Sequence, residues 1–406
     1  MSYPSNRERS MNCQRTAVVR FALCLLVTVS MVTNGCGGSS SPHVRKTEGV
    51  SPAKSESKSI AVDGRVLRIS GPCLHRNLSV FLFHGEDSTT DEFITLREGL
   101  ESGEVVLSEK GSGRRTASSD GNSSSRSRLE REVERLAYQN LVRGSSGAAV
   151  NTLMVDNRGD LPVYIQAGDI VKGGRQDRTI GVDIVIVPHS GNVPLAAFCV
   201  EQGRWAYRDG VARGGRFSLS TQYISSKDLK LAVRHSKNQQ DVWKKVRDVQ
   251  VALSKSLSTG IYSAASPSSL QLALENKTLR MNIDAYLVEF GGLVGKYDDV
   301  IGYAFAINGK LNSADVYASS LLFRKLWPKL LESSSTEAIA HLNGKEAKEA
   351  CTVAHVTSCL REAERGKPVA RDLEGGLGSV TRESEKSYLF ETRRDGVSLR
   401  KNYLTK

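Results

Sequence analysis

Residues 167–205 read AGDIVKGGRQDRTIGVDIVIVPHSGNVPLAAFCVEQGRW and hold the densest pattern in the chain. Two runs in this stretch, Thr179–Val187 and Leu195–Val200, are rich in β-branched and aromatic residues and are bounded by Gly, Pro and Asn. Short runs of this kind with such boundaries predict β-strands. The glycine pair Gly173-Gly174 predicts a turn before the first of them. The stretch therefore places part of a β-sheet at the centre of the chain.

Towards the N-terminus the sequence continues to show short runs typical of β-strands. Further strands are predicted at Ser79–Phe83, Glu104–Leu107, Asn151–Val155 and Val163–Gln166. Their length and spacing are typical of a β-sandwich or a barrel-like sheet. One helix is predicted to interrupt them at Leu129–Val142, where LEREVERLAYQNLV has helical periodicity.

After about residue 225 the pattern becomes mixed. Apolar residues at 242, 246, 249 and 253 follow the inner stripe of a helix. Further helices are predicted at 284–290 and around 322–330, the latter kinked or broken at Pro328. A buried strand at 300–307 ends in the hairpin dipeptide Asn308-Gly309, and 388–392 and 398–404 form a closing hairpin around Asp395-Gly396. The expected class is α+β, with a mostly β N-terminal half followed by a mixed helical and strand C-terminal half.

Composition and length limit the class of protein. The 406 residues are 39% hydrophobic and 25% charged, which excludes a wholly disordered chain. The net charge of +12 is compatible with an anionic partner. The basic segments lack interleaved aromatic residues, so we expect no nucleic-acid partner.

The N-terminal residues predict export. Arg7, Arg9, Arg15 and Arg20 precede the apolar run 21–32, whose twelve residues would rise about 18 Å as a helix, too short for a hydrocarbon core of about 30 Å. A basic segment and a short apolar segment are typical of an export signal. Cys36 follows Thr33-Asn34-Gly35, which resembles a bacterial lipobox with Thr in place of the usual Leu. We expect acylation of Cys36 and an outer-membrane lipoprotein of the bacterial cell envelope, facing the periplasm. Cleavage near Gly35 without acylation, or an uncleaved anchor, are the alternatives.

The expected organisation follows from these observations. Residues 1–35 form the export signal and 36–59 a flexible, Ser-rich tether. Residues 60–224 form a β-rich core with a low-complexity insertion at 111–128, and 225–406 form an α+β region. Four cysteines remain after the leader and Cys36, namely Cys73, Cys199, Cys351 and Cys359, and their pairing is left open. No Cys/His spacing typical of a metal site occurs, and no cofactor is expected.

The GGRQDR block is the first candidate ligand site. Gly173 and Gly174 allow backbone N–H groups to approach a ligand closely. Arg175 and Arg178 flank Gln176-Asp177, so two forked cationic donors stand beside an acceptor. A phosphate, pyrophosphate or carboxylate would suit this pattern. Alternatively, Asp177 bridges the arginines and fixes a turn between two strands.

Glu201 is the second candidate. In the strand 195–201 it shares one face with Leu195, Ala197 and Cys199, and a carboxylate there needs a partner such as Arg204. Glu201 and Asp177 are candidate catalytic acid and base, and Arg204 and Trp205 candidate ligand contacts, Trp205 by stacking. The alternatives are a structural ion pair and a core tryptophan. A nucleophilic arrangement of Cys199, His189 and Asp183 is disfavoured because a mid-strand thiol usually behaves as a small hydrophobe.

Several short motifs in the sequence resemble those of one protein family. Gly168-Asp169, the GGRQDR block, Cys199-Val200-Glu201 and Gly203-Arg204-Trp205 resemble the ARG and Rhodanese-Phosphatase-superfamily-associated Protein domain family. The resemblance extends over about 60–406, including 306–331 and the terminal RKNYLTK, and is strongest at 150–205. The family has no established catalytic mechanism. Its name implies association with ADP-ribosylglycohydrolase-type and rhodanese/phosphatase-type proteins, and hence a ligand related to ADP-ribose or NAD.

Three functions remain open at this point. The first is an exported, lipid-anchored protein that binds a phosphorylated, ADP-ribose-like or nucleotide-like molecule through the GGRQDR block. The second is a hydrolase of an ADP-ribose-like bond that uses Glu201 and Asp177. The third is a structural or interaction protein of the envelope. Whether the chain is an enzyme is therefore left open.

Overall fold

The computed structural model describes residues 58–62, 64–109, 152–204, 216–344, 347, 349–372 and 377–406. These residues belong to one compact unit, Ala53–Lys406. The predicted export signal, most of the tether, the insertion at 111–128 and the helix at 129–142 lie outside the described residues.

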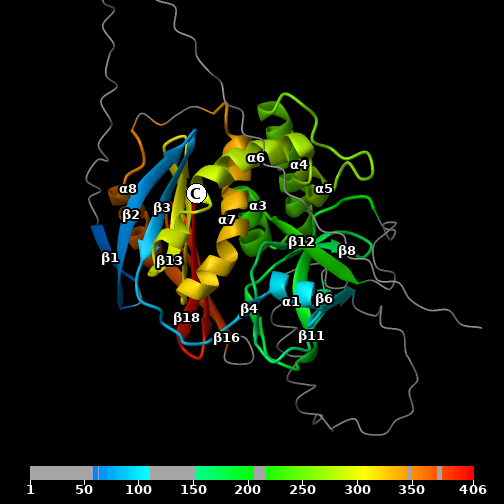
Figure 1. Ribbon diagram of the computed structural model, residues 1–406, viewed down its shortest axis with the longest axis horizontal. Coiled ribbons are helices and arrows are strands. Elements are labelled where there is room, and N and C mark those ends of the chain that lie inside the picture. The colour runs from blue at the N-terminus through cyan, green and yellow to red at the C-terminus, as the bar shows by residue number, and fades with distance from the viewer. Residues whose placement is uncertain are drawn as a thin grey trace, which may run out of the picture. The chain divides into compact units, whose positions relative to one another are not determined.

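A nine-stranded antiparallel sheet is the largest element (Figure 1). Its strand order is β1-β2-β3-β13-β14-β18-β17-β16-β15. The bounds are β1 Lys58–Val62, β2 Arg65–His75, β3 Leu78–His84, β13 Val300–Ile307, β14 Lys310–Tyr317, β15 Lys367–Asp372, β16 Leu377–Glu383, β17 Ser387–Arg394 and β18 Val397–Thr405. The sheet therefore combines strands from both sides of the predicted boundary at 224/225.

Apolar side chains cover both faces of this sheet. In β3, Val80 and Leu82 join a core with the helices on one face, whereas Phe81 and Phe83 join a second core on the other. The first face is covered by α6 (Lys277–Phe290) and α7 (Ser320–Ala340), with α4 (Gln239–Ser256) packed against α7, and the second by α8 (Val353–Glu364), as Figure 1 shows. Burial on both faces explains why β3 and β13 read as continuous apolar runs.

A second sheet of six strands has the order β12-β8-β9-β11-β6-β5. A bridge between Ser108 of β5 and Arg216, the residue before β12, joins its two edges, so the sheet is a nearly closed barrel. The bounds are β5 Val105–Glu109, β6 Thr152–Asn157, β8 Asp169–Gly173, β9 Arg178–Ile180, β11 Gly191–Cys199 and β12 Phe217–Tyr223. A small sheet, β10-β7-β4, adds β4 Ile94–Thr95, β7 Val163–Ile165 and β10 Ile184–Ile186. The remaining helices are α1 Leu96–Ser102, α3 Lys227–Leu231, α5 Leu270–Leu274, the π-helical turn η1 Ala232–Ser236 and the short η2 Val294–Lys296.

The α+β class with a barrel-like N-terminal sheet is thus confirmed. The inner stripe of Val242, Val246, Val249 and Leu253 is buried in α4. Asn308 and Gly309 adopt φ of 50° and 77° in the β13–β14 hairpin, as a primed turn requires.

Two local predictions need correction. The strand predicted at 179–187 is two strands, β9 and β10, which lie in different sheets. Asp183 lies between them and pairs with Arg234 and Arg400, which a continuous strand in one sheet would not permit. The second correction concerns Pro328, which does not break its helix: α7 is assigned as one element from Ser320 to Ala340. Leu326, Trp327 and Leu330 are buried around the proline, and their packing holds the helix together.

Candidate functional site

The GGRQDR block forms the turn between β8 and β9. Gly173 and Gly174 have φ of 140° and 53°, which residues with side chains rarely adopt. A Cβ on Gly174 would lie 2.6 Å from Phe217 Cζ and from Glu109 Oε1. The turn therefore needs glycine at 174 for close packing against β12 and β5.

Asp177, Glu201 and Arg204 form a buried ionic network beneath this turn. Asp177 and Glu201 are fully buried, and the Arg204 side chain is 12% exposed. Arg204 donates from Nε to Glu201 Oε1 at 2.8 Å, and its Nη2 lies 2.7 Å from Glu201 Oε2 and 3.5 Å from Asp177 Oδ1. Asp177 also accepts from Gly173 N at 3.1 Å and from Ser269 Oγ at 3.0 Å. The network joins the turn to α5 and to the end of β11.

The protonation of Glu201 bears on its predicted catalytic role. Burial raises the pKa of Glu201, but hydrogen bonds from Arg204, Ser266 and the Asp177 N–H outweigh burial and hold it below its ordinary value. A general acid needs a pKa near the working pH. Glu201 is ionised at neutral pH and enclosed, which favours the structural interpretation of this carboxylate.

The other residues of the block divide between the interior and the surface. Gln176 is buried and donates to the Glu201 carbonyl at 2.8 Å, while its Oε1 accepts from Arg178 Nη1 at 3.1 Å. Arg178 also contacts Cys199 Sγ. The side chain of Arg175 is 59% exposed, and the backbone N–H of Arg175 donates to Glu109 Oε1 at 2.7 Å. Trp205 lies outside the described residues. The structure thus brings Gln176, Asp177, Arg178, Glu201 and Arg204 together as mutual partners, with Arg175 apart.

Cys199, His189 and Asp183 do not form a nucleophilic triad. His189 faces Asp160 at the surface, with 3.0 Å between Nε2 and Oδ1. Burial, outweighing Arg178, raises the pKa of the Cys199 thiol to about 11. Asp183 faces two arginines elsewhere, so the three groups have separate partners.

Asp183 is the centre of a second buried network. Its Oδ1 accepts from Arg400 Nη1 at 2.7 Å and from Ala167 N at 2.7 Å. Its Oδ2 accepts from Arg234 Nη2 at 2.9 Å and from Thr392 Oγ1 at 3.0 Å. Arg400 also donates to Asp315. This network connects the segment between β9 and β10 to β14, β17 and β18 of the nine-stranded sheet.

Beside this network lies a cavity of about 270 Å³, which we call the cationic cavity. Its lining residues are Gly181, Val182, Asp183, Arg234, Lys237, Arg371, Asp372, Ser379, Val380, Thr381, Phe390, Glu391 and Thr392. The π-helical turn η1 and the left-handed residue that ends it, Lys237 (φ 51°), hold the first two cations. π-Helical turns are frequent at functional sites.

The cations of this cavity differ in their partners. Arg234 pairs with Asp183 and lies over the Phe390 ring at 4.6 Å. Within the described part of the chain, the side chains of Lys237 and Arg371 form no ion pair or hydrogen bond. Burial, with the neighbouring charges of Arg371 and Arg234, lowers the pKa of Lys237 to about 8. The lining thus holds three cations and the three acids Asp183, Asp372 and Glu391, and two of its cations, Lys237 and Arg371, have no ion-pair partner among the described residues.

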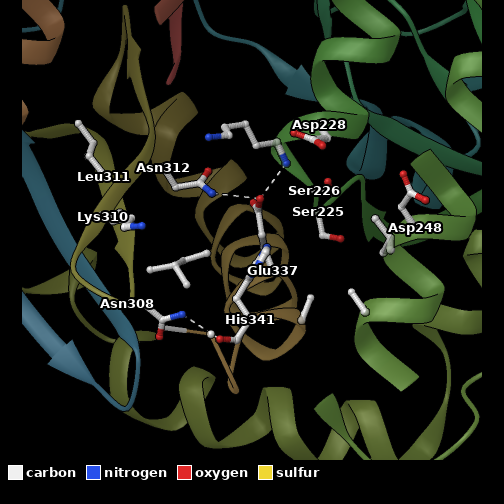
Figure 2. A pocket seen from close by; sticks show the side chains of 16 residues that line it. Ser225, Ser226, Asp228, Asp248, Asn308, Lys310, Leu311, Asn312, Glu337 and His341 are labelled. Atoms are coloured by element: carbon white, nitrogen blue, oxygen red, sulfur yellow. Dashed lines mark hydrogen bonds between the residues drawn. The ribbon is translucent and has the colours of Figure 1, made fainter. Parts of the chain in front are cut away.

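A larger cavity of about 520 Å³ lies at the C-terminal end of α7, and we call it the Glu337 cavity. Figure 2 shows Glu337 on α7 with its carboxylate towards Asn312 of β14 and the first turn of α3. In the same view Asp228 and Asp248 lie to the right of Glu337, with Asn312 to its left. The cavity shares no lining residue with the cationic cavity.

Sequence reasoning missed both cavities. The basic run Arg234-His235-Ser236-Lys237 was the available signal for the cationic cavity, but nothing linked it to Arg371 on a distant strand. Among the described residues, no group of three or more His, Cys, Asp or Glu side chains could hold a metal ion, and Cys73, Cys199, Cys351 and Cys359 are free thiols. No helix in the described ranges has the length and apolar character to cross a membrane.

Comparison with known proteins bears on the family. The family model for the ARG and Rhodanese-Phosphatase-superfamily-associated Protein domain matches residues 66–394. No curated protein and no solved structure matches the chain. The matched segment contains the GGRQDR turn, Asp183 and the residues lining both cavities, whereas Arg400 lies beyond its end. The chain therefore belongs to the ARG and Rhodanese-Phosphatase-superfamily-associated Protein domain family.

Proposed function

We propose that the protein is an exported, lipid-anchored binding protein that holds a small phosphorylated or otherwise anionic molecule in the cationic cavity. The observation that carries the proposal is the pair Lys237 and Arg371, which line one cavity and have no counter-ion among the described residues. Like charges held near one another raise the free energy of the folded protein, and a bound anion removes this repulsion. The export and acylation of Cys36 rest on the leader sequence alone.

The size and chemistry of the cavity define the ligand class. Ligand cavities usually measure about 300–1,000 Å³, so 270 Å³ suits a phosphoryl or pyrophosphoryl group rather than a whole dinucleotide. Arg371 can bind two oxygens of such a group through its fork, and Lys237 contributes a point charge. Thr381 and Ser379, on the same wall, carry hydroxyl groups. Of the three acids in the lining, Asp183 and Glu391 already pair with arginines and offer an anion less repulsion, whereas Asp372 is exposed to solvent.

The GGRQDR block supports this function indirectly. Its carboxylates and Arg204 neutralise one another in the interior, which leaves Arg175 as the exposed cation of the block. The hydrolase hypothesis required an accessible acid and base, but Glu201 and Asp177 are both fully buried. We therefore place ligand binding in the cationic cavity and assign the block to the stability of the barrel.

Calorimetric titration of the full-length protein in detergent with inorganic pyrophosphate and with ADP-ribose tests the proposal. Hydrogen bonds to charged groups contribute about 1.5–3 kcal/mol, so Lys237→Gln and Arg371→Gln should each weaken pyrophosphate binding about tenfold or more. Lys244→Gln and Arg361→Gln remove exposed cations outside the cavity and are the matched controls. No binding at millimolar pyrophosphate, or equal losses in the controls, would reject the cavity as the site. If only Arg175→Gln lost pyrophosphate binding, the result would indicate that the ligand binds at the GGRQDR block.

A further inference from the structure

Glu337 carries a buried carboxylate oxygen that lacks a donor. The residue is 4% exposed and lies in the last turn of α7. Its Oε1 accepts from the Lys227 N–H at 2.8 Å and from Asn312 Nδ2 at 3.0 Å. Its Oε2 is buried and forms no hydrogen bond with any described residue, and the same holds for Asn312 Oδ1. A buried acceptor without a donor destabilises the folded protein, and more so when it is charged.

The nearby cations do not supply the missing donor. Lys227 donates from its side chain to Thr405 Oγ1 at 3.0 Å, and Lys310 is exposed. Lys230 is buried and attracts Glu337 electrostatically, but it forms no hydrogen bond to Oε2. Across the cavity, Asp228 and Asp248 share Lys245, whose Nζ lies 2.7 Å and 3.8 Å from their carboxylates. The unsatisfied acceptors therefore need a donor from outside the described residues.

The Glu337 cavity offers room for a ligand that brings this donor. Its volume of about 520 Å³ lies within the usual range of small-molecule sites. Glu337 and Asn312 belong to its polar part, and Val249, Ala252 and Ile307 give an apolar wall. The other charged residues of the lining are Lys227, Asp228, Asp248 and Lys310. The carbonyl end of α7 adds negative potential, which favours a cation. A polar head beside an apolar wall suits a short alkyl chain with one charged end.

We propose that the Glu337 cavity binds a small molecule through a primary ammonium group that donates to Glu337 Oε2 and Asn312 Oδ1. An ammonium has three donors and no acceptor, so it complements two acceptors on side chains that are hydrogen-bonded to one another. Its bond to the carboxylate is charge-assisted, which a neutral hydroxyl does not provide. A metal ion fits less well, since no group of three or more metal-binding side chains occurs among the described residues.

Ligand-observed NMR on the full-length protein in detergent tests this proposal at pH 7. The probes are n-butylamine and 1-butanol, which have the same number of heavy atoms and differ in the head group. Butylamine should bind and butanol should bind at least tenfold more weakly. Glu337→Gln keeps the side-chain volume and an Oε1 acceptor for Lys227 and Asn312, and should reduce butylamine affinity tenfold or more.

Two further variants separate this result from a loss of structure. Glu289→Gln removes an equal charge from the exposed face of α6 and should bind butylamine as the parent protein does. Ala252→Phe fills the apolar wall without changing charge and should also abolish binding. Equal binding of the two probes, no binding of butylamine, or undiminished binding in a folded Glu337→Gln variant would overturn the proposal. Because the two cavities share no residue, these outcomes are independent of pyrophosphate binding.

Discussion

Arg400 Nη1 donates to Asp183 Oδ1 at 2.7 Å, and both side chains are almost completely buried. Asp183 belongs to the segment between β9 and β10, and Arg400 belongs to β18 in the nine-stranded sheet. Asp315 and Arg234 complete the charge balance around them. The ion pair of Asp183 with Arg400 therefore connects the segment between β9 and β10 to the nine-stranded sheet. Asp183 also lines the cationic cavity.

Acid should weaken the protein through Asp183. Burial raises the pKa of Asp183, but Arg234 and Arg400 outweigh burial and hold it at about 2, against an ordinary value of 3.8. Since the unfolded chain binds this proton more tightly, the stabilisation is complete above about pH 4 and is lost as pH falls towards 2. It amounts to about 2 kcal/mol. Urea unfolding measures the free energy of unfolding at several pH values between about 2 and 5. This free energy should change less with pH in Asp183→Asn than in the exposed control Asp160→Asn.

Two arginines of the central motif should behave differently. Arg204→Met leaves Glu201 and Asp177 without their cation in the interior and should lower the free energy of unfolding by about 3–5 kcal/mol. Arg175→Met changes an exposed side chain and should alter it by no more than about 0.5 kcal/mol. Urea denaturation measures both. A folded, equally stable Arg204→Met variant would show that the buried network is not structural.

Anion binding should weaken as the pH rises through 8. Lys237 has its pKa lowered to about 8, so half of its charge is lost there, whereas sulfate keeps its charge. Sulfate affinity should fall between pH 7 and 9 in the parent protein. Lys237→Arg, whose guanidinium stays charged, should bind sulfate with little change over the same interval. Calorimetry at several pH values compares the two, and an identical decline in both would exclude Lys237 as the titrating contact.

The anchor prediction concerns Cys36. One acyl chain gives only marginal membrane binding, but a diacylglyceryl cysteine carries at least two chains and holds a protein stably. The native protein should therefore fractionate with membranes, and Cys36→Ser should release it or leave the precursor uncleaved. Mass spectrometry of the mature N-terminus checks the modification directly. An unmodified Cys36 would contradict the predicted lipid anchor but not the predicted export.

Local patterns predicted much of the fold. The stripe from Val242 to Leu253 and the hairpin at Asn308-Gly309 depend on residues a few positions apart, and both are present. The break between β9 and β10 depends on Arg400, which lies far along the chain, so periodicity gave no sign of it. The apolar run 179–187 therefore read as one strand.

The candidate site was harder for the same reason. The sequence indicated charged partners for Glu201 and named Arg204 among them, which the structure places in contact. Whether that pair is open or buried depends on α5 and on Ser269, which no local pattern reveals. The cationic cavity joins Lys237 after η1 to Arg371 on β15, and the Glu337 cavity joins α7 to β14 and α3. Such sites come from tertiary packing alone.

The pairing of β3 with β13 has a consequence for how the chain is made. β3 ends at His84, whereas β13 begins only at Val300, yet they are neighbours at the middle of the sheet. During synthesis the N-terminal strands must wait for most of the polypeptide before their partner emerges, and contacts this distant in sequence form slowly. The nascent protein therefore stays without its main sheet through most of translation, and the export proposed above would use this interval, because a translocase engages an extended chain.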